Sequence, residues 1–187
     1  IPTLGSGRIF PLAEEVITID QMPNPIPRDW VTLGGIDFGW DHPTGLVQIW
    51  WDRDSDVIYV ERAVRARQQT PVLVAHQVKT WGEWLPWAWP HDGMQHDKGS
   101  GMQLAKQYRD AGMNMLPEMA RFPETKDDGE TETSRVSVEA GVSEMLERMQ
   151  TGRLKVCKHL NDWLEEFRLY HRKDGKIVKE ADDLLCA

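Results

Sequence analysis

Three short acidic stretches of the 187-residue chain could together perform metal-ion chemistry. They are GGIDFGWDHPTG with Asp37, PHDG with Asp92, and the terminal ADDLLCA with Asp182 and Asp183. A single carboxylate inside an apolar strand costs several kcal/mol unless it is compensated. Three carboxylates within a few Å of one another cannot all stay charged alone, and a divalent cation resolves that conflict.

Hard oxygen ligands suit Mg²⁺ or Mn²⁺, which keep bound waters and bridge substrate phosphates. Two such ions about 4 Å apart would activate an attacking water and stabilise the leaving oxygen in phosphodiester cleavage. The acids therefore predict a two-metal hydrolytic site, provided that the fold brings them together.

The elements that would position these acids begin with three strands. Apolar and β-rich runs at 30–39, 45–53 and 56–64, joined by the short turns DHPT and DSD, predict an antiparallel meander. Asp37 lies near the end of the first run. A fourth strand at 86–92 would end at Asp92.

If the first and fourth strands are neighbours, Asp37 and Asp92 converge at one edge of the sheet, where functional groups gather in α/β folds. A last helix packed against that edge would add Asp182 or Asp183. With a fifth strand over 113–118, the order predicts an α/β fold with a mixed five-stranded sheet, three antiparallel strands plus two parallel, flanked by helices. Helical patterns cover 71–84, 99–112, 134–152, 159–174 and 180–187, and RLKVC at 153–157 is a further short strand or a link.

Residues 1–29 contain five prolines and little periodicity, which indicates an arm or an interdomain linker. The globular domain is expected to span 30–187. Since the chain begins at Ile1 and stops after DDLLCA, we expect it to be a piece of a longer protein.

The three acidic stretches, in this order and setting, resemble the acidic motifs of the nuclease domain of tailed-bacteriophage terminase large subunits. The resemblance covers about residues 30–187. It implies a ribonuclease H-like fold and an endonuclease that uses Mg²⁺ or Mn²⁺ to cut concatemeric double-stranded viral DNA during genome packaging.

By that resemblance, Asp37 and Asp92 carry over as catalytic metal ligands. The third position differs, because many family members have a further aspartate just before an alanine, and here Cys186 precedes Ala187. A soft thiolate suits Mg²⁺ poorly. The third ligand is therefore expected to be Asp183 or Asp182, and Asp183 is favoured.

The resemblance also implies partners and a location. These are double-stranded DNA, an upstream ATPase domain of the same polypeptide, a portal protein and a small terminase subunit, in the cytoplasm of the infected bacterial host. The chain contains no GxxxxGK[ST] motif, so the ATPase of the motor is not within it. No apolar run approaches the roughly 20 residues of a membrane span, so no membrane partner is expected.

Other polar residues near the acidic stretches have weaker signals. Lys98, beside GSG, is a candidate phosphate contact, helped by backbone N–H groups at the following helix start. Asp41 is either a turn residue or a carboxylate that contacts a metal ligand and not the metal itself. His91 and His96 have a spacing that could bind zinc, but nothing completes the site. Glu61 is an auxiliary ligand or an exposed strand residue.

The net charge of −8 argues against a broad nucleic-acid-binding surface. The segment 148–179 nevertheless holds nine Lys or Arg against four acids, which is either a basic face or a solvated helix face with ion pairs. Cys157 and Cys186 form no CxxC motif, so reduced, structural thiols are expected.

Two other functions stay open. An actin- or sugar-kinase-like ATPase fragment also begins with D-x-G after a first strand, but it needs a second such hairpin and about twice this length. A non-catalytic module that docks to DNA or to the portal would tolerate the loss of the acids. Loss of cutting in Asp37→Ala with the fold retained would separate a nuclease from that module.

Overall fold

The computed structural model describes residues 7–91, 103–120, 124–125, 131–132, 138–180 and 182–187. Over these residues the chain forms one seven-stranded sheet with the strand order β1-β9-β4-β3-β2-β5-β6. Two further two-stranded ladders pair β10 with β11 and β7 (Glu124–Thr125) with β8 (Thr131–Glu132). Asp92, His96 and Lys98 lie outside the described residues.

The predicted antiparallel meander is confirmed. β2 (Val31–Asp37), β3 (Thr44–Asp52) and β4 (Val57–Ala66) pair in sequence, with one register shift at Gln48/Ile49. These strands are rich in Val, Ile and aromatic residues, which pack well on a pleated surface. They form the centre of the sheet, so their ends determine where Asp37 lies.

The two predicted parallel strands are also present, but they are shorter than expected, and the fourth run ends as a strand at Ala88 rather than at Asp92. β5 (Pro86–Ala88) pairs in parallel with β2, and β6 (Asn114–Met115) pairs in parallel with β5. Two more strands extend the other edge: β9 (Leu154–Cys157) is parallel to β4, and β1 (Thr18–Ile19) is parallel to β9. The expected count of five is therefore corrected to seven in the described part, because the RLKVC segment and the Pro-rich segment each add a strand.

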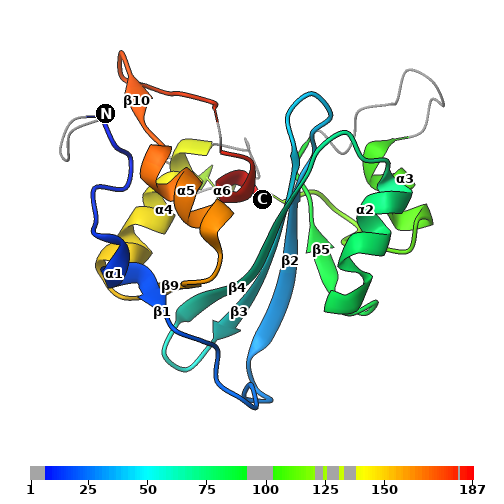
Figure 1. Ribbon diagram of the computed structural model, residues 1–187, viewed down its shortest axis with the longest axis horizontal. Helices are drawn as coiled ribbons and strands as arrows, with labels where there is room; N and C mark the ends of the chain where they lie inside the picture. The colour runs from blue at the N-terminus through cyan, green and yellow to red at the C-terminus, as the bar shows by residue number, and fades with distance from the viewer. Residues whose placement is uncertain (1–6, 92–102, 121–123, 126–130, 133–137, 181) are drawn as a thin grey trace.

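Helices cover both faces of the sheet, which Figure 1 shows between two groups of helices. Alternation along the strands directs Ile36 and Leu46 to one face and Val47 to the other. The Ile36 face packs against α2 (Pro71–Val78), the 3₁₀ turn η1 (Lys79–Trp81) and α3 (Leu104–Asp110). The Val47 face is covered by α1 (Glu14–Ile17), α4 (Val138–Gln150), α5 (Asn161–Leu169) and α6 (Asp183–Cys186).

The local start signal of α2 is confirmed. The Thr70 side chain accepts a hydrogen bond from the Leu73 backbone N–H at 3.5 Å, and Pro71 occupies the first helical turn. None of the helices in the described ranges is long and apolar enough to cross a membrane.

The described part of the Pro-rich segment packs against the Val47 face. Phe10 and Ile17 are fully buried, and the Phe10 ring stacks on Phe167 with centroids 5.9 Å apart. The proline-rich composition of this segment gave no indication that Phe10 and Ile17 belong to the core. The division of the chain at residue 29 remains a prediction.

The helix predicted over 159–174 is shorter than expected. α5 ends at Leu169, and a hairpin of β10 (Arg172–Lys173) and β11 (Lys176–Ile177) follows. Asp174 and Gly175 form its turn with φ values of +52° and +75°. An Asp-Gly pair suits this turn because both residues tolerate positive φ, and that local preference overrides continuation of the helix.

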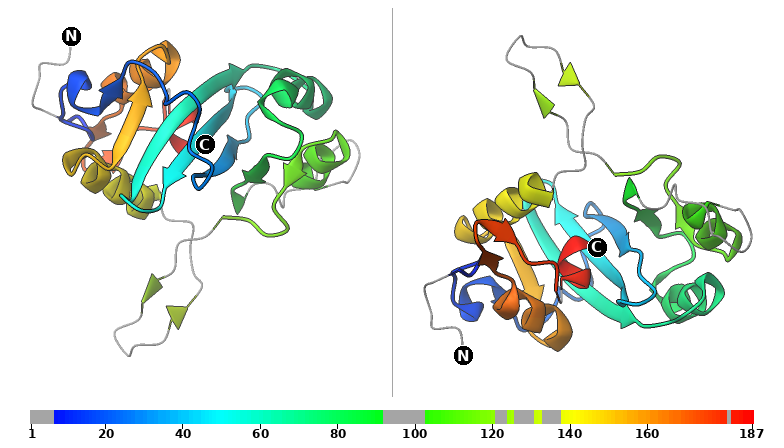
Figure 2. Two further views of the ribbon diagram at one scale, coloured as in Figure 1. Left: turned by 90° about the horizontal axis from the view of Figure 1, so that it is seen from below. Right: turned by 90° about the horizontal axis from the view of Figure 1, so that it is seen from above.

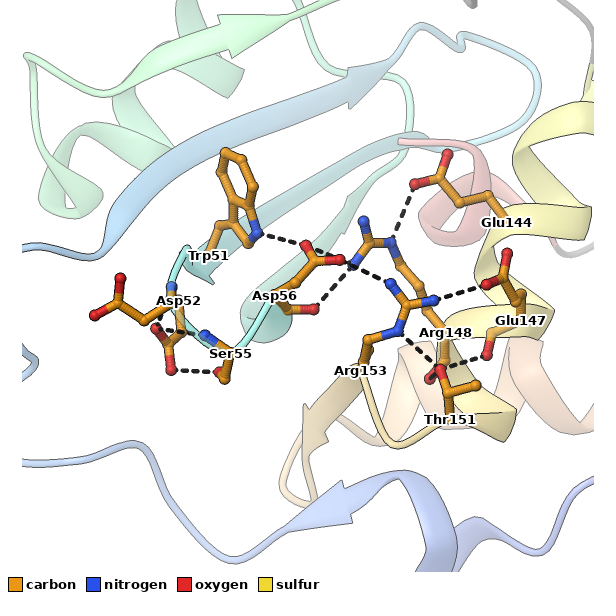
Figure 3. Close-up of polar contacts among 10 residues, drawn as sticks. Trp51, Asp52, Ser55, Asp56, Glu144, Glu147, Arg148, Thr151 and Arg153 are labelled. Carbon is orange, nitrogen blue, oxygen red and sulfur yellow. Dashed lines mark hydrogen bonds and ion pairs between the residues drawn. The ribbon is translucent and has the colours of Figure 1, made fainter.

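The basic segment 148–179 is largely ion-paired. At the β3–β4 turn, Asp56 accepts hydrogen bonds from Arg148, Arg153 and the Trp51 indole, and this cluster joins α4 to the meander (Figure 3). Within the described part of the chain, five of the nine basic residues have carboxylate partners, namely Arg148, Arg153, Lys158, Arg168 and Arg172. The structure therefore favours ion pairs over an open basic face for these five residues.

Candidate functional site

Asp37 is the last residue of β2, and its register places it in a short row across the meander. Asp37 lies opposite Gly45 of β3, and Gly45 lies opposite Arg65 of β4. Residues that pair directly across strands point to the same face of a sheet. The side chains of Asp37 and Arg65 thus share one face, with only a hydrogen atom between them at Gly45.

The last helix, α6, occupies the space that two glycines leave on this face. A Cβ atom on Gly45 would lie 2.0 Å from the carbonyl oxygen of Asp183, and one on Gly35 would lie 2.5 Å from the carbonyl oxygen of Ala187. Figure 2 shows α6 lying across the sheet at β2 and β3. The absence of side chains at both positions lets the helix backbone approach the strands.

The aspartates of α6 are thereby brought to the Asp37 end of the sheet. Asp183 is partly buried, and burial raises its pKa, with a further rise from the neighbouring Asp182 carboxylate. The charges of His42 and Arg65 lower the same pKa. Two adjacent acids in a partly desolvated position are the arrangement that a cation would stabilise.

The Cys186 thiol lies beside Asp182 and is affected by the charge of Asp37. Its thiol donates a hydrogen bond to Asp182 Oδ2 at 3.6 Å. Although Cys186 as a residue is exposed, desolvation of the thiol raises its pKa, and the carboxylates of Asp182 and Asp37 raise it further. The thiol thus stays protonated at neutral pH. That Cys186 is not a metal ligand remains a prediction.

The turn from β2 to β3 is held closed beside Asp37. The buried Thr44 hydroxyl accepts a hydrogen bond from Gly39 N at 3.2 Å and donates one to Gly39 O at 2.9 Å. A Cβ atom on Gly39 would lie 2.5 Å from the carbonyl oxygens of His42 and Pro43, so the turn needs a glycine here. Asp41 is exposed in this turn.

The first and fourth predicted strands, β2 and β5, are neighbours, as the convergence of Asp37 and Asp92 requires. β5 runs parallel to β2, with Gly35 opposite Ala88, so its carboxyl end lies at the same edge of the sheet as Asp37. His91 follows this end and is exposed. Asp92 comes next and lies outside the described residues, as do His96 and Lys98. Glu61, in β4, is partly buried and accepts a hydrogen bond from the Trp50 indole N–H.

The donor set fits a hard divalent cation. Asp37 and Asp182 both act on the Cys186 thiol, and carboxylate oxygens are the ligands that Mg²⁺ and Mn²⁺ prefer. Within the described ranges no group of three or more His, Cys, Asp or Glu side chains is arranged to hold a metal ion.

Two residues beside the site, Glu166 and Arg65, were not expected from the sequence. Glu166 of α5 has no exposed surface, and its Oε2 accepts hydrogen bonds from the backbone N–H groups of Leu184 at 2.8 Å and Leu185 at 3.1 Å. Its Oε1 accepts from Arg65 Nε at 2.9 Å. The only sequence signal was an acid beside the apolar stripe of a helix, which by itself does not indicate burial.

Comparison with known proteins now identifies the family. Residues 34–187 match the family model described as the terminase RNaseH-like domain. This chain belongs to that family. The terminase domain is also 48% identical to the terminase large subunits of Enterobacteria phage LP7 and Salmonella phage P22 over 188 aligned positions. The match covers 100% of the chain but only 37% and 36% of those two proteins.

Solved structures agree with this assignment. The nuclease domain of the P22 large terminase matches with a TM-score of 0.83 and 46% identity, over 98% of this chain and 89% of that one. A manganese-soaked human cytomegalovirus terminase nuclease domain shares the fold, with a TM-score of 0.57 at 13% identity, over 93% of this chain and 89% of that one. The expected terminase family and the ribonuclease H-like fold are both confirmed.

Proposed function

We propose that this terminase domain is a metal-dependent endonuclease that cuts concatemeric double-stranded viral DNA during genome packaging. The observation that carries the proposal is the position of α6 on Gly35 and Gly45, which brings Asp182 and Asp183 to the edge where Asp37 ends β2. The similarity to the P22 nuclease domain supports the same reaction class.

The residues proposed to hold the metal ions are Asp37, Asp92 and the Asp182–Asp183 pair. Bound Mg²⁺ or Mn²⁺ would supply an activated water and charge stabilisation for the leaving oxygen. Within the pair, the sequence favours Asp183, whereas Asp182 is favoured by its hydrogen bond with the Cys186 thiol, whose pKa the Asp37 charge also raises. Lys98 is proposed as a contact to a DNA phosphate.

The remaining assignments concern the longer protein. We propose that residues 1–29 connect this domain to an upstream ATPase domain, and that the whole protein works with a portal protein and a small terminase subunit in the host cytoplasm. The family match and the large-subunit relatives support this setting. The family match also removes the support for a kinase-like ATPase fragment.

The test is cleavage of supercoiled plasmid with Mn²⁺, Mg²⁺ or EDTA. Wild type is expected to cut only with metal, and Asp37→Asn and Asp92→Asn are expected to lose cutting while they keep the far-UV circular dichroism of the wild type. Asp54→Asn, in the exposed β3–β4 turn, is the control and should cut normally. Cutting in EDTA, or full activity of both site variants, would contradict the proposal and favour a docking module.

The same assay resolves the third ligand. Asp182→Asn and Asp183→Asn are compared over a range of Mn²⁺ concentrations. The variant that removes a ligand should lower the maximal rate by orders of magnitude, whereas loss of its neighbour should change the rate less. Equal, near-normal rates for both variants would show that α6 supplies no ligand.

A further inference from the structure

The buried carboxylate of Glu166 holds the N-terminus of α6. The N–H groups at the start of a helix lack intrahelical partners, and Leu184 and Leu185 supply two of them in α6. Both donate to Glu166 Oε2, at 2.8 and 3.1 Å. The capping group therefore comes from α5, 18 residues before Leu184, and not from α6 itself.

This arrangement keeps the Asp182 side chain out of the cap. Asp182 is the N-cap residue of α6, yet its side chain makes no capping hydrogen bond. An N-cap aspartate ordinarily accepts from the second or third N–H of its helix. Glu166 already occupies those donors, and the Asp182 carboxylate instead accepts a hydrogen bond from the Cys186 thiol.

Arg65 connects the same carboxylate to the sheet. Its Nε donates to Glu166 Oε1 at 2.9 Å, and its Nη2 donates to the Asp162 carbonyl at 2.7 Å and to Glu165 Oε2 at 3.1 Å. Arg65 lies in the row that contains Gly45 and Asp37. The guanidinium also compensates a carboxylate that would otherwise be a costly buried charge.

We propose that Glu166 and Arg65 are positioning residues for metal binding. They fix the first turn of α6 relative to the end of β2, so the acids of the third stretch meet Asp37 in one geometry. Mg²⁺ and Mn²⁺ sites tolerate little error in ligand placement, and loss of an outer-shell partner typically costs about 10–100-fold in metal affinity. The inference rests on the proposed nuclease function.

The experiment measures Mn²⁺ binding by calorimetry, and the Mn²⁺ concentration for half-maximal plasmid cleavage, on the 187-residue chain. Glu166→Ala is expected to raise both the dissociation constant and that concentration by about 10–100-fold. Glu166→Gln keeps an oxygen for the two N–H groups but turns an amide toward Arg65, so a smaller rise is expected. Arg65→Lys keeps the positive charge but loses the several N–H donors of the guanidinium. It should therefore also raise the dissociation constant and the half-maximal Mn²⁺ concentration.

The matched control is Asp56→Asn. Asp56 also joins a helix to the meander through two arginines (Figure 3). It lies between the end of β3 and the start of β4, at the opposite end of these strands from Asp37. The Asp56→Asn variant should have a lower thermal unfolding midpoint than wild type and an unchanged Mn²⁺ requirement. If Glu166→Ala does not fold, Glu166→Gln carries the test.

Unchanged Mn²⁺ binding in the folded Glu166 variants, or an equal shift in Asp56→Asn, would overturn the positioning role. A wild type that neither binds Mn²⁺ nor cuts would instead overturn the proposed function.

Discussion

Gly45 of β3 and Asp183 of α6 are in direct backbone contact, although they come from opposite ends of the domain's sequence. A Cβ atom at Gly45 would lie 2.0 Å from the Asp183 carbonyl oxygen. The neighbour is backbone rather than the end of a flexible side chain, so the helix itself would have to move. The backbone of α6 thus approaches the Asp37 end of the meander this closely only because β3 has no side chain at this position.

Gly45→Ala is therefore expected to displace α6. Overpacking of this kind typically costs about 1–3 kcal/mol in the free energy of unfolding. Mn²⁺-dependent cleavage should fall by more than this loss explains, because Asp182 and Asp183 move away from Asp37. Urea unfolding and plasmid cleavage, measured on the same preparation, check this.

Gly152→Ala is the control for Gly45→Ala. Gly152 has a φ of +72°, and no atom lies within 4 Å of the position that a Cβ atom would take there, so alanine strains the backbone without touching α6. It should cost about 1–2 kcal/mol and leave the metal requirement unchanged. If Gly45→Ala, like Gly152→Ala, lowers stability but leaves the metal requirement unchanged, the close packing of α6 on Gly45 does not control metal-dependent cleavage.

The thiol of Cys186 reports on the two carboxylates around it. Asp182 and Asp37 both raise its pKa, after desolvation. Asp182→Asn should therefore lower that pKa and speed alkylation of Cys186 by iodoacetamide near pH ~8.5, because a larger fraction is thiolate. Mass spectrometry separates this site from Cys157, which is buried. Asp54→Asn should leave the rate unchanged, and a slower or unaltered rate in Asp182→Asn would contradict the placement of Asp182 beside the thiol.

Glu166 is expected to make stability depend on pH between 4.5 and about 7. Burial raises its pKa from 4.5 to about 7, although the N–H groups of Leu184 and Leu185 and the charge of Arg65 oppose the rise. In this window the folded chain binds more protons than the unfolded chain, so the stability contributed at low pH is lost as pH rises through the folded pKa. The unfolding midpoint of wild type minus that of Glu166→Gln should therefore shrink as pH rises across this window. A difference that grows with pH would contradict this.

Asp56 should have the opposite pH dependence. Hydrogen bonds from Trp51 and then from Arg153 lower its pKa below 3.8. The stability it contributes is present above pH 3.8 and is lost as pH falls through the lower, folded pKa. Asp56→Asn should thus lower the thermal midpoint at neutral pH and converge with wild type in strong acid. Asparagine is the suitable replacement because residue 56 has a φ of +53°, which alanine tolerates less well. If the two thermal midpoints still differ in strong acid, the charge of Asp56 is not the cause of the difference.

Local patterns in the sequence determined most of the fold. Alternating apolar strands, the Thr70–Pro71 helix start and the change of period after the third strand run at 56–64 predicted the meander, the two parallel strands and the order of the helices. They failed where a local signal was weak or ambiguous. The Asp174–Gly175 turn ended α5 early, and the apolar residues Phe10 and Ile17 were hidden among prolines.

The sequence by itself also identified the three acidic stretches and their family, because residue type and order are visible without coordinates. Only the tertiary structure decided how α6 reaches Asp37. That approach depends on contacts between residues far apart in the chain: Gly45 with Asp183, Gly35 with Ala187, and Glu166 with the start of α6. The position of a glycine or a glutamate in the sequence does not indicate which residue will pack against it. The packing of α6 on Gly35 and Gly45, and its capping by Glu166, are therefore visible only in the tertiary structure.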